Sequence, residues 1–457
     1  MSGVLASSVD GRSFTTSAGE GAPTGTLVRL ETTDGAWLAL VEAVSPDGAE
    51  VGRVLGVLDG DGGLDQRSDA PFRNAHVRPA DAASVDALHR AAQATLDIGT
   101  MLASPGPAKL IGTRFNRHTF WCGQSGSGKT YALGVLLERL ILQTDLRVAI
   151  FDPNADFVQL GRTLPGVAED DARRLAERDV RVLRSDLTRT EGADKLRLRF
   201  RSMPRAAQAA VLQLDPIRDQ AEYNAFIRTL AQLGSIDLGP LMENLRAGTE
   251  ADRRLAHRVE NLGLAEWEVW ARDLPSAADI VTGSQGVTVM DLGGFGDPLE
   301  PVSLALEVVE ELWAQRDRRA PTLLVIDEAH NLCRADPGNP VAELLLDRLI
   351  QIAAEGRKYG LWLLLSSQRP SKIHPQILSQ CDNLMLMRMN SPDDIVELGR
   401  TFGFAPHQML RASTGFVQGE ALLAGGFAPV PMLVQMRTRI TAQGGSDVAV
   451  PLVSTPD

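Results

Sequence analysis

The run from Gly123 to Thr130 constrains this chain more than any other feature of its sequence. It reads Gly-Gln-Ser-Gly-Ser-Gly-Lys-Thr, follows an apolar strand at 119–122 and opens an apolar helix at 131–142. This is the context of a phosphate-binding loop, in which glycines let backbone N–H groups face inward and the start of the helix adds positive potential. Lys129 is placed to reach the β- and γ-phosphates, and Thr130 to offer its hydroxyl to magnesium. We therefore expect a triphosphate against Gly123, Gln124, Ser125, Gly126, Ser127, Gly128, Lys129 and Thr130.

A second pattern lies downstream, where the apolar strand 322–326 ends in Asp327 and Glu328. A carboxylate at the end of a strand can hold magnesium through water, and its neighbour can orient and activate the attacking water. An ordinary transition from strand to loop has the same composition. The position of the pair after the phosphate loop favours the functional interpretation, with Asp327 at the metal and Glu328 at the water.

Two further segments have open alternatives. Gln368 stands at the tip of the next strand. Neighbouring strand ends of a wound sheet meet at one crevice, so Gln368 can sense the γ-phosphate there. It can equally be a residue that caps a loop. Arg357 and Lys358 lie in the run 355–360, at the end of a helix that begins near Val341. Basic residues suit the last turn of any helix. The sharper interpretation is an arginine finger that reaches the γ-phosphate of a neighbouring subunit.

Asp152 and Asp156 follow the strand at 148–151. Two acids near the crevice can join the magnesium shell or help to place water. They can equally be turn formers, because Asp, Pro and Asn are common in turns. The residues alone leave both possibilities open.

The order of patterns along the chain predicts an α/β protein. Three short alternating segments separated by Asp-Gly turns indicate a small antiparallel sheet or barrel before the phosphate loop. The predicted units are a loose tail (1–25), a small β-barrel domain with a linker helix (26–103), the first part of a wound ATPase core (104–202), a helical insert (203–275), the second part of the core with C-terminal strands (276–440), and a frayed end (441–457).

The composition excludes several classes of protein. A net charge of −12 over 457 residues argues against a surface that coats nucleic acid, so any DNA contact must be confined to a local basic lining. No apolar run approaches the roughly 20 residues of a membrane helix, and the start of the chain lacks the pattern of a signal peptide. Cys122, Cys333 and Cys381 have neither metal-clip nor disulfide spacing. We expect a cytoplasmic protein without a membrane anchor.

Taken together, these motifs resemble the HerA family, in the HerA and FtsK branch of P-loop ATPases. The resemblance covers most of the chain and includes the phosphate loop, Asp152-Pro153, the insert, the segment 326–330, the segment 355–360 and Ser367-Gln368-Arg369-Pro370. It implies a RecA-like P-loop core with a helical insert, preceded by a small N-terminal barrel of the HAS-barrel type. It further implies ATP and Mg²⁺ as cofactors, a homo-hexameric ring with ATP between subunits, double-stranded DNA in the central channel, and a nuclease or other effector on the barrel face.

Carried over to matching positions, the resemblance gives Lys129 and Thr130 to phosphate and magnesium, Asp327 and Glu328 to metal and water, Gln368 to sensing and Arg357 to the subunit interface. Lys358 is the alternate finger. The chain departs from the family at Asn154-Ala155-Asp156, where His-Gly-Glu is more usual, and this puts a catalytic duty for Asp156 in doubt. Our leading hypothesis is a DNA translocase for end processing or antiviral defence. The alternatives are a nucleotide-gated ring scaffold for an effector enzyme, and a conjugation or secretion motor.

Overall fold

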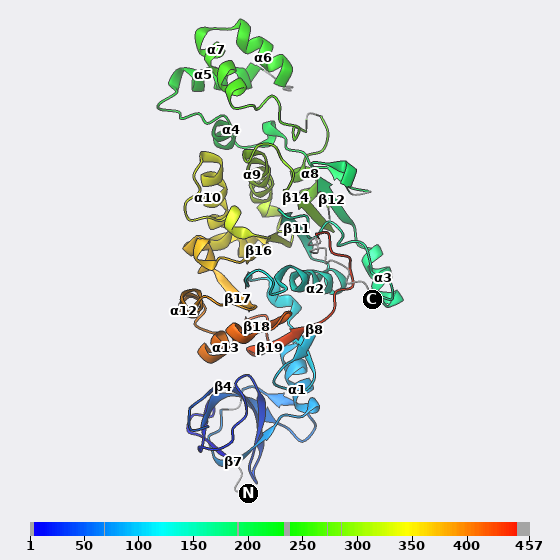
Figure 1. Cartoon of the computed structure of the whole chain (residues 1–457), viewed down its shortest axis with the longest axis vertical. Helices are drawn as coiled ribbons and strands as arrows, with labels where there is room; N and C mark the ends of the chain where they lie inside the picture. Colours follow the sequence, from blue (N-terminus) through cyan, green and yellow to red (C-terminus); the bar gives the residue numbers. More distant parts are fainter. Residues whose placement is uncertain are drawn as a thin grey trace, which may run out of the picture.

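The structure of the protein is a computed structural model. It describes residues 4–67, 69–189, 192–232, 238–271, 273–284 and 286–445. The molecule is elongated, with a β-barrel at one end, an α/β domain in the middle and a group of helices at the other end (Figure 1). This arrangement confirms the predicted fold class of a P-loop α/β core with a helical insert and a preceding barrel.

The barrel forms because short strands with alternating burial close on themselves. Its order is β2-β1-β7-β3-β4-β5, and β2 also pairs with β5. The aromatic rings of Trp37 and Phe72 pack inside, with centroids 4.6 Å apart. The strands are β1 (Leu5–Ser8), β2 (Ser13–Thr16), β3 (Leu27–Glu31), β4 (Ala36–Val44), β5 (Glu50–Leu58) and β7 (Phe72–Pro79), and a short β6 (Leu64–Asp65) is added on β5.

The prediction of a loose tail over 1–25 is wrong for the described part of that segment. Strands β1 and β2 complete the barrel, and the side chains of Ala6 and Phe14 are buried in it. Their Ser and Thr residues give these strands little apolar signal in the sequence, although Thr is enriched in strands.

The central domain is built on one large sheet of order β13-β12-β14-β11-β15-β16-β10-β17-β18-β19-β8-β9. Strands from β13 to β17 in this order run parallel, and the remaining neighbours pair antiparallel. The bounds are β8 (Leu96–Met101), β9 (Pro107–Leu110), β10 (His118–Cys122), β11 (Arg147–Asp152), β12 (Val180–Arg184), β13 (Asp194–Lys195), β14 (Val287–Asp291), β15 (Thr322–Ile326), β16 (Leu361–Ser367), β17 (Cys381–Leu386), β18 (Glu420–Gly425) and β19 (Met432–Met436).

Helices cover both faces of this sheet, which buries its strands almost completely. One apolar core joins the sheet to α8, α9, α10, α12 and α13, and a second joins its other face to α1, α2 and α3. The bounds are α1 (Ala82–Ala92), α2 (Lys129–Gln143), α3 (Glu169–Ala176), α8 (Ala277–Gly283), α9 (Leu299–Ala314), α10 (Pro340–Glu355), α11 (Pro375–Leu378), α12 (Pro392–Thr401) and α13 (His407–Ala412).

Two predicted boundaries of the core, at 103/104 and at 440/441, are wrong. The boundary at 103/104 falls inside a hairpin, because β8 and β9 pair with each other and β8 pairs with β19 of the large sheet. The predicted linker helix ends at Ala92, where Gln93 adopts a left-handed conformation. The segment predicted to fray from 441 begins with Thr441, which is buried and bridges to Thr163; residues 446–457 lie outside the described part of the chain.

The insert is helical, as predicted, with α4 (Arg205–Val211), α5 (Gln220–Gln232), α6 (Leu238–Ala247) and α7 (Glu250–Asn261). Helix α7 ends at Asn261, and Gly263 then takes a positive φ of 63°. The indole rings of Trp267 and Trp270 stack beyond this turn. Helices α5, α6 and α7 form the end of the molecule opposite the barrel (Figure 1).

Among the residues that the structure describes, no helix combines the length and the apolar character needed to cross a lipid bilayer. Cys122, Cys333 and Cys381 are free and buried.

Candidate active site

The phosphate loop connects the end of β10 to the first turn of α2. Gly126 and Gly128 have φ values of 75° and 88°, which side-chain-bearing residues rarely adopt. A Cβ on Gly123 would lie 2.8 Å from Cβ of Met387, so a larger residue does not fit there. The backbone N–H of Gly419, just before β18, donates to the carbonyl of Ser127 over 3.1 Å. The loop is thus held from two sides, with the N-terminus of α2 behind it.

Strand order brings the predicted side chains together. Strand β16 lies between β10 and β15, so residues after each of these strands meet at one edge. The Lys129 Nζ atom lies 3.1 Å from Asp327 Oδ1, 3.1 Å from Glu328 Oε1 and 2.8 Å from Ser366 Oγ. Burial disfavours the charge on Lys129, but the two carboxylates outweigh this effect and raise its pKa. The ammonium is therefore charged and already placed where phosphate oxygens would arrive.

Glu328 lies between Gln368 and His330. Its Oε1 accepts a hydrogen bond of 2.8 Å from the Gln368 amide, and its Oε2 lies 3.1 Å from Nδ1 of His330. Burial lowers the pKa of His330, so the imidazole is neutral at pH 7. Its Nδ1 atom also lies 3.3 Å from the Ser367 hydroxyl oxygen. The backbone of Glu328 is left-handed, with φ 43° and ψ 49°. Such strain in a side-chain-bearing residue is typical of functional sites.

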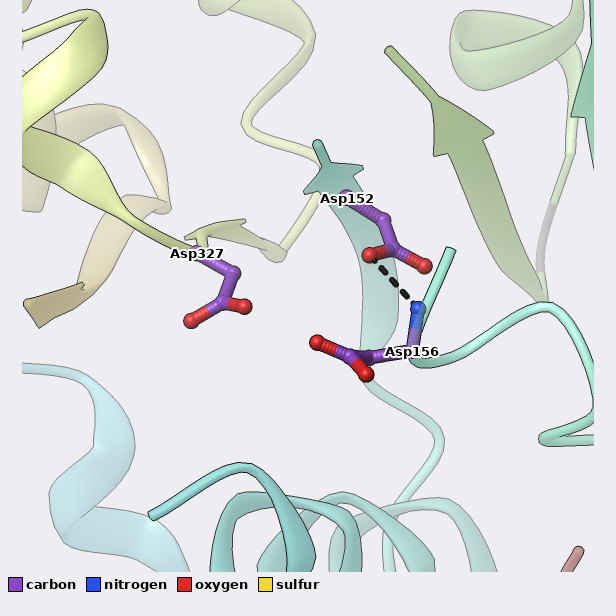
Figure 2. Close-up of side chains that lie close together, drawn as sticks. All are labelled: Asp152, Asp156 and Asp327. Atoms are coloured by element: carbon purple, nitrogen blue, oxygen red, sulfur yellow. Dashed lines mark hydrogen bonds between the residues drawn. The ribbon is translucent and has the colours of Figure 1, made fainter. Parts of the chain in front are cut away.

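Asp152, Asp156 and Asp327 point toward one shared space from two strand ends and the loop after β11 (Figure 2). One carboxylate oxygen of each lies within 4.8 Å of the others. The Asp152 carboxylate is fixed by the backbone N–H groups of Asp156 and Phe157, at 3.0 and 2.8 Å. Burial raises the pKa of Asp152 to about 7, and burial together with the negative Asp327 raises that of Asp156 to about 6. Asp156 therefore lies inside the site and not in a surface turn.

The residues present fit magnesium and a triphosphate. Within the described part of the chain, Asp327 Oδ2 and Ser127 Oγ are buried without a hydrogen-bond partner, which costs free energy unless a ligand supplies one. Carboxylate and hydroxyl oxygens are the ligands that magnesium prefers. Thr130, half-buried in the first turn of α2, and Asp327 would hold the cation; Asp152 and Asp156 line the same space.

Arg357 lies away from this site. It precedes β16, whose first residue pairs with Thr322, whereas the phosphate loop follows the other end of the parallel strands. The seven residues of β16 separate the two edges by roughly 20 Å. The guanidinium of Arg357 instead donates to Asp382 Oδ2 over 2.7 Å. Arg357 therefore does not contact a phosphate bound to its own chain.

Arg357 lines a cleft of about 690 Å³ between the barrel and the core. Its charged lining consists of Arg53, Arg114, Arg117, Arg357 and Asp382. Lys358, the alternate finger, is exposed beside it. This is a local basic lining on an acidic chain.

Three contributors to the site were not predicted from the sequence. Ser366 binds Lys129, His330 contacts Glu328, and the segment after β19 reaches the loop that carries Asp156. Ser366 and His330 are both within three residues of a predicted site residue, so a search of the motif neighbourhoods would find them. The contact of the C-terminal segment has no local sequence signal.

The fold and this site define the class: the chain is a P-loop ATPase, with ATP as the nucleotide. Within that class its likeness to HerA is confirmed, because the family described as "Helicase HerA, central domain" matches residues 96–292. The DNA double-strand break repair helicase HerA of Sulfurisphaera tokodaii is 23% identical over 417 residues, which cover 85% of this chain and 78% of that relative.

Two other likenesses differ in extent. The probable DNA double-strand break repair helicase HerA of Methanocaldococcus jannaschii is 31% identical over 130 residues, 28% of this chain, and the match spans only 25% of that relative's length. The structure of VirB4 of Thermoanaerobacter pseudethanolicus matches with a TM-score of 0.50 at 16% identity and covers 76% of this chain and 97% of that chain. The structural match supports the fold.

Proposed function

We propose that copies of this chain form a homo-hexameric ring that hydrolyses ATP with Mg²⁺ and uses the energy to move double-stranded DNA. The observation that carries the proposal is the split of the catalytic groups between two edges of one sheet. Lys129, Glu328 and Gln368 meet at the carboxyl edge, and Arg357 stands at the other. A site that uses all four needs a second copy of the chain.

Hydrolysis would proceed by phosphoryl transfer to water, for which the protein mainly supplies position and charge. Lys129 would exchange Asp327 and Glu328 for the β- and γ-phosphates. Glu328 would then accept the proton of the attacking water, with its carboxylate oriented by Gln368. Magnesium bound at Thr130 and Asp327 would neutralise charge on the phosphates. Arg357 of the neighbouring copy would stabilise the charge that develops on the γ-phosphate.

DNA as the substrate is supported by the relatives, whose names describe repair of DNA double-strand breaks. The net charge of −12 fits a narrow basic lining inside a ring better than a coated outer surface. We further propose that a nuclease or another effector docks on the face of the barrel, in DNA end processing or antiviral defence.

The test is the ATP hydrolysis rate of the purified chain with and without linear duplex DNA, after its mass has been verified. We expect a hexamer whose rate rises with DNA and is lost in Lys129→Ala. A slow rate that ignores DNA, together with an effector enzyme that needs the ring, would instead support the scaffold hypothesis. A single-copy protein without hydrolysis would overturn the proposal.

A further inference from the structure

The segment after β19 crosses the phosphate-loop helix. We call residues 437–445 the strap; its trace, in red, leaves β19 and passes α2 (Figure 1). The backbone N–H of Arg439 donates to the Tyr131 hydroxyl over 2.8 Å. The N–H groups of Ile440 and Thr441 donate to the buried carboxylate of Glu138 over 3.0 and 2.8 Å. The strap is therefore bonded to two side chains of α2.

Arg439 carries the centre of this crossing. Its side chain has no exposed surface, and its Nε lies 3.0 Å from Thr441 Oγ1 and 3.4 Å from Glu138 Oε1. The guanidinium lies 5.8 Å from the ring centroid of Phe157. Among the described residues, its Nη1 and Nη2 atoms have no hydrogen-bond partner. Such burial of a cation is costly unless carboxylates lie near, and here Glu138 and Asp156 supply the compensating charge.

Gly134 shows that α2 is shaped for this arginine. A glycine in a helix interior is less favourable than alanine. A Cβ at this position would lie 2.6 Å from Cζ of Arg439 and 2.7 Å from its Nε. The glycine therefore opens the surface of α2 to the guanidinium.

The far end of the strap holds the loop that follows β11. The N–H of Gly444 donates to the Asp156 carbonyl over 3.1 Å, and the N–H of Ala442 donates to the Arg162 carbonyl over 2.9 Å. A Cβ on Gly444 would lie 2.0 Å from the carbonyl oxygen of Ala155, so the two backbones touch. The strap thus ties α2 to the loop that carries Asp156.

We propose that Arg439 is a positioning residue of the ATP site: seated on Gly134 against Phe157, it fixes the 152–157 loop on α2 and so sets the places of Asp152 and Asp156 beside Asp327. Because its side chain has no exposed surface, Arg439 would act through this loop and not by contact with nucleotide or metal. The inference rests on the proposed ATP hydrolysis for its effect on turnover, but its structural content does not.

The experiment compares Arg439→Met, Arg439→Lys and Gly134→Ala with wild type in the full-length protein. Arg437→Met is the matched control, because Arg437 belongs to the strap but pairs with Asp97 instead of crossing Gly134. Amide hydrogen exchange of 152–157 is measured without nucleotide, and kcat and KM are measured with ATP. In Arg439→Met we expect faster exchange in this loop and a kcat lower by about 10- to 100-fold, as for a misplaced catalytic geometry, with KM within threefold or so.

Gly134→Ala should reproduce this pattern by displacing the guanidinium. Arg439→Lys should show smaller changes in loop exchange and kcat than Arg439→Met. In the double variant Gly134→Ala/Arg439→Met the two effects should not add, because one contact is removed twice. Gly134→Ala also tests the proposal if Arg439→Met fails to fold. Loop exchange and kcat equal to those of Arg437→Met, or additive effects, would overturn it. A wild type that lacks ATP hydrolysis would refute the proposed function, and the exchange data would still decide the role of Arg439.

Discussion

Replacement of Glu328 by Gln is expected to tighten ATP binding while it stops hydrolysis. Without nucleotide, Lys129 is engaged by Asp327, Glu328 and Ser366, and it must leave these acceptors to reach phosphate. The substitution turns one charged acceptor into a neutral one of the same shape. It also removes a negative charge from the place where the γ-phosphate would lie, so both effects favour the bound state.

The magnitude follows from the hydrogen bond that changes. A bond to a charged group contributes roughly 1.5–3 kcal/mol and a neutral one roughly 0.5–1.5 kcal/mol. By the midpoints of these ranges the release of Lys129 becomes easier by at most about 1.25 kcal/mol, because its ammonium stays charged. This difference corresponds to a Kd lower by up to roughly eightfold. Hydrolysis should fall to background, because Gln at 328 accepts no proton from water.

The assay is the Kd of a fluorescent ATP analogue with Mg²⁺, measured beside single-turnover hydrolysis. Asp327→Asn is the control: it loosens Lys129 in the same way but removes a proposed metal ligand, so binding with Mg²⁺ should not tighten. Weaker binding by Glu328→Gln, or hydrolysis at the rate of wild type, would refute this reasoning.

Three further outcomes are expected. Lys129→Ala should abolish hydrolysis and, by leaving Asp327 and Glu328 buried without their cation, lower stability by roughly 3–5 kcal/mol in thermal or denaturant unfolding. Arg357→Ala should keep ATP binding but lose about 10³- to 10⁵-fold in turnover, and mixing it with Lys129→Ala subunits should restore some sites; no rescue would contradict a role in trans. Burial raises the pKa of Glu307 to about 8, so the folded state holds a proton that the unfolded chain releases near its ordinary value of 4.5. The stability that the protonated Glu307 allows is fully present below pH 4.5 and is lost as pH rises to 8. Glu307→Gln should therefore raise the free energy of unfolding at pH 8 by on the order of 2 kcal/mol, seen as a higher melting temperature, and should change it little at pH 4.5.

The core and its main site were predictable because local patterns determine them. Strands such as β15 are continuous apolar runs, and the residues that follow them must meet at one edge once the sheet is parallel. The contacts of Lys129 with Asp327 and of Gln368 with Glu328 follow from that rule. The separation of Arg357 from its own phosphate loop follows from it as well.

Other features depend on contacts that no local pattern records. Strands β1 and β2 are polar, and the neighbours that bury one face of each lie far along the chain. The hairpin β8–β9 joins the large sheet only because β19 arrives from the other end of the chain. From the sequence alone, Gly134 is only an unfavourable residue in the middle of α2, because the Arg439 side chain that needs the space lies far along the chain.

The measurement that tests the account most directly is displacement of a labelled third strand from a DNA triplex. A motor that moves along duplex DNA strips the third strand as it passes, whereas a nucleotide-gated scaffold does not. We predict displacement that needs ATP and a duplex approach of sufficient length, and none with Glu328→Gln. An assembled protein that hydrolyses ATP but leaves the triplex intact on every such substrate would contradict the central claim.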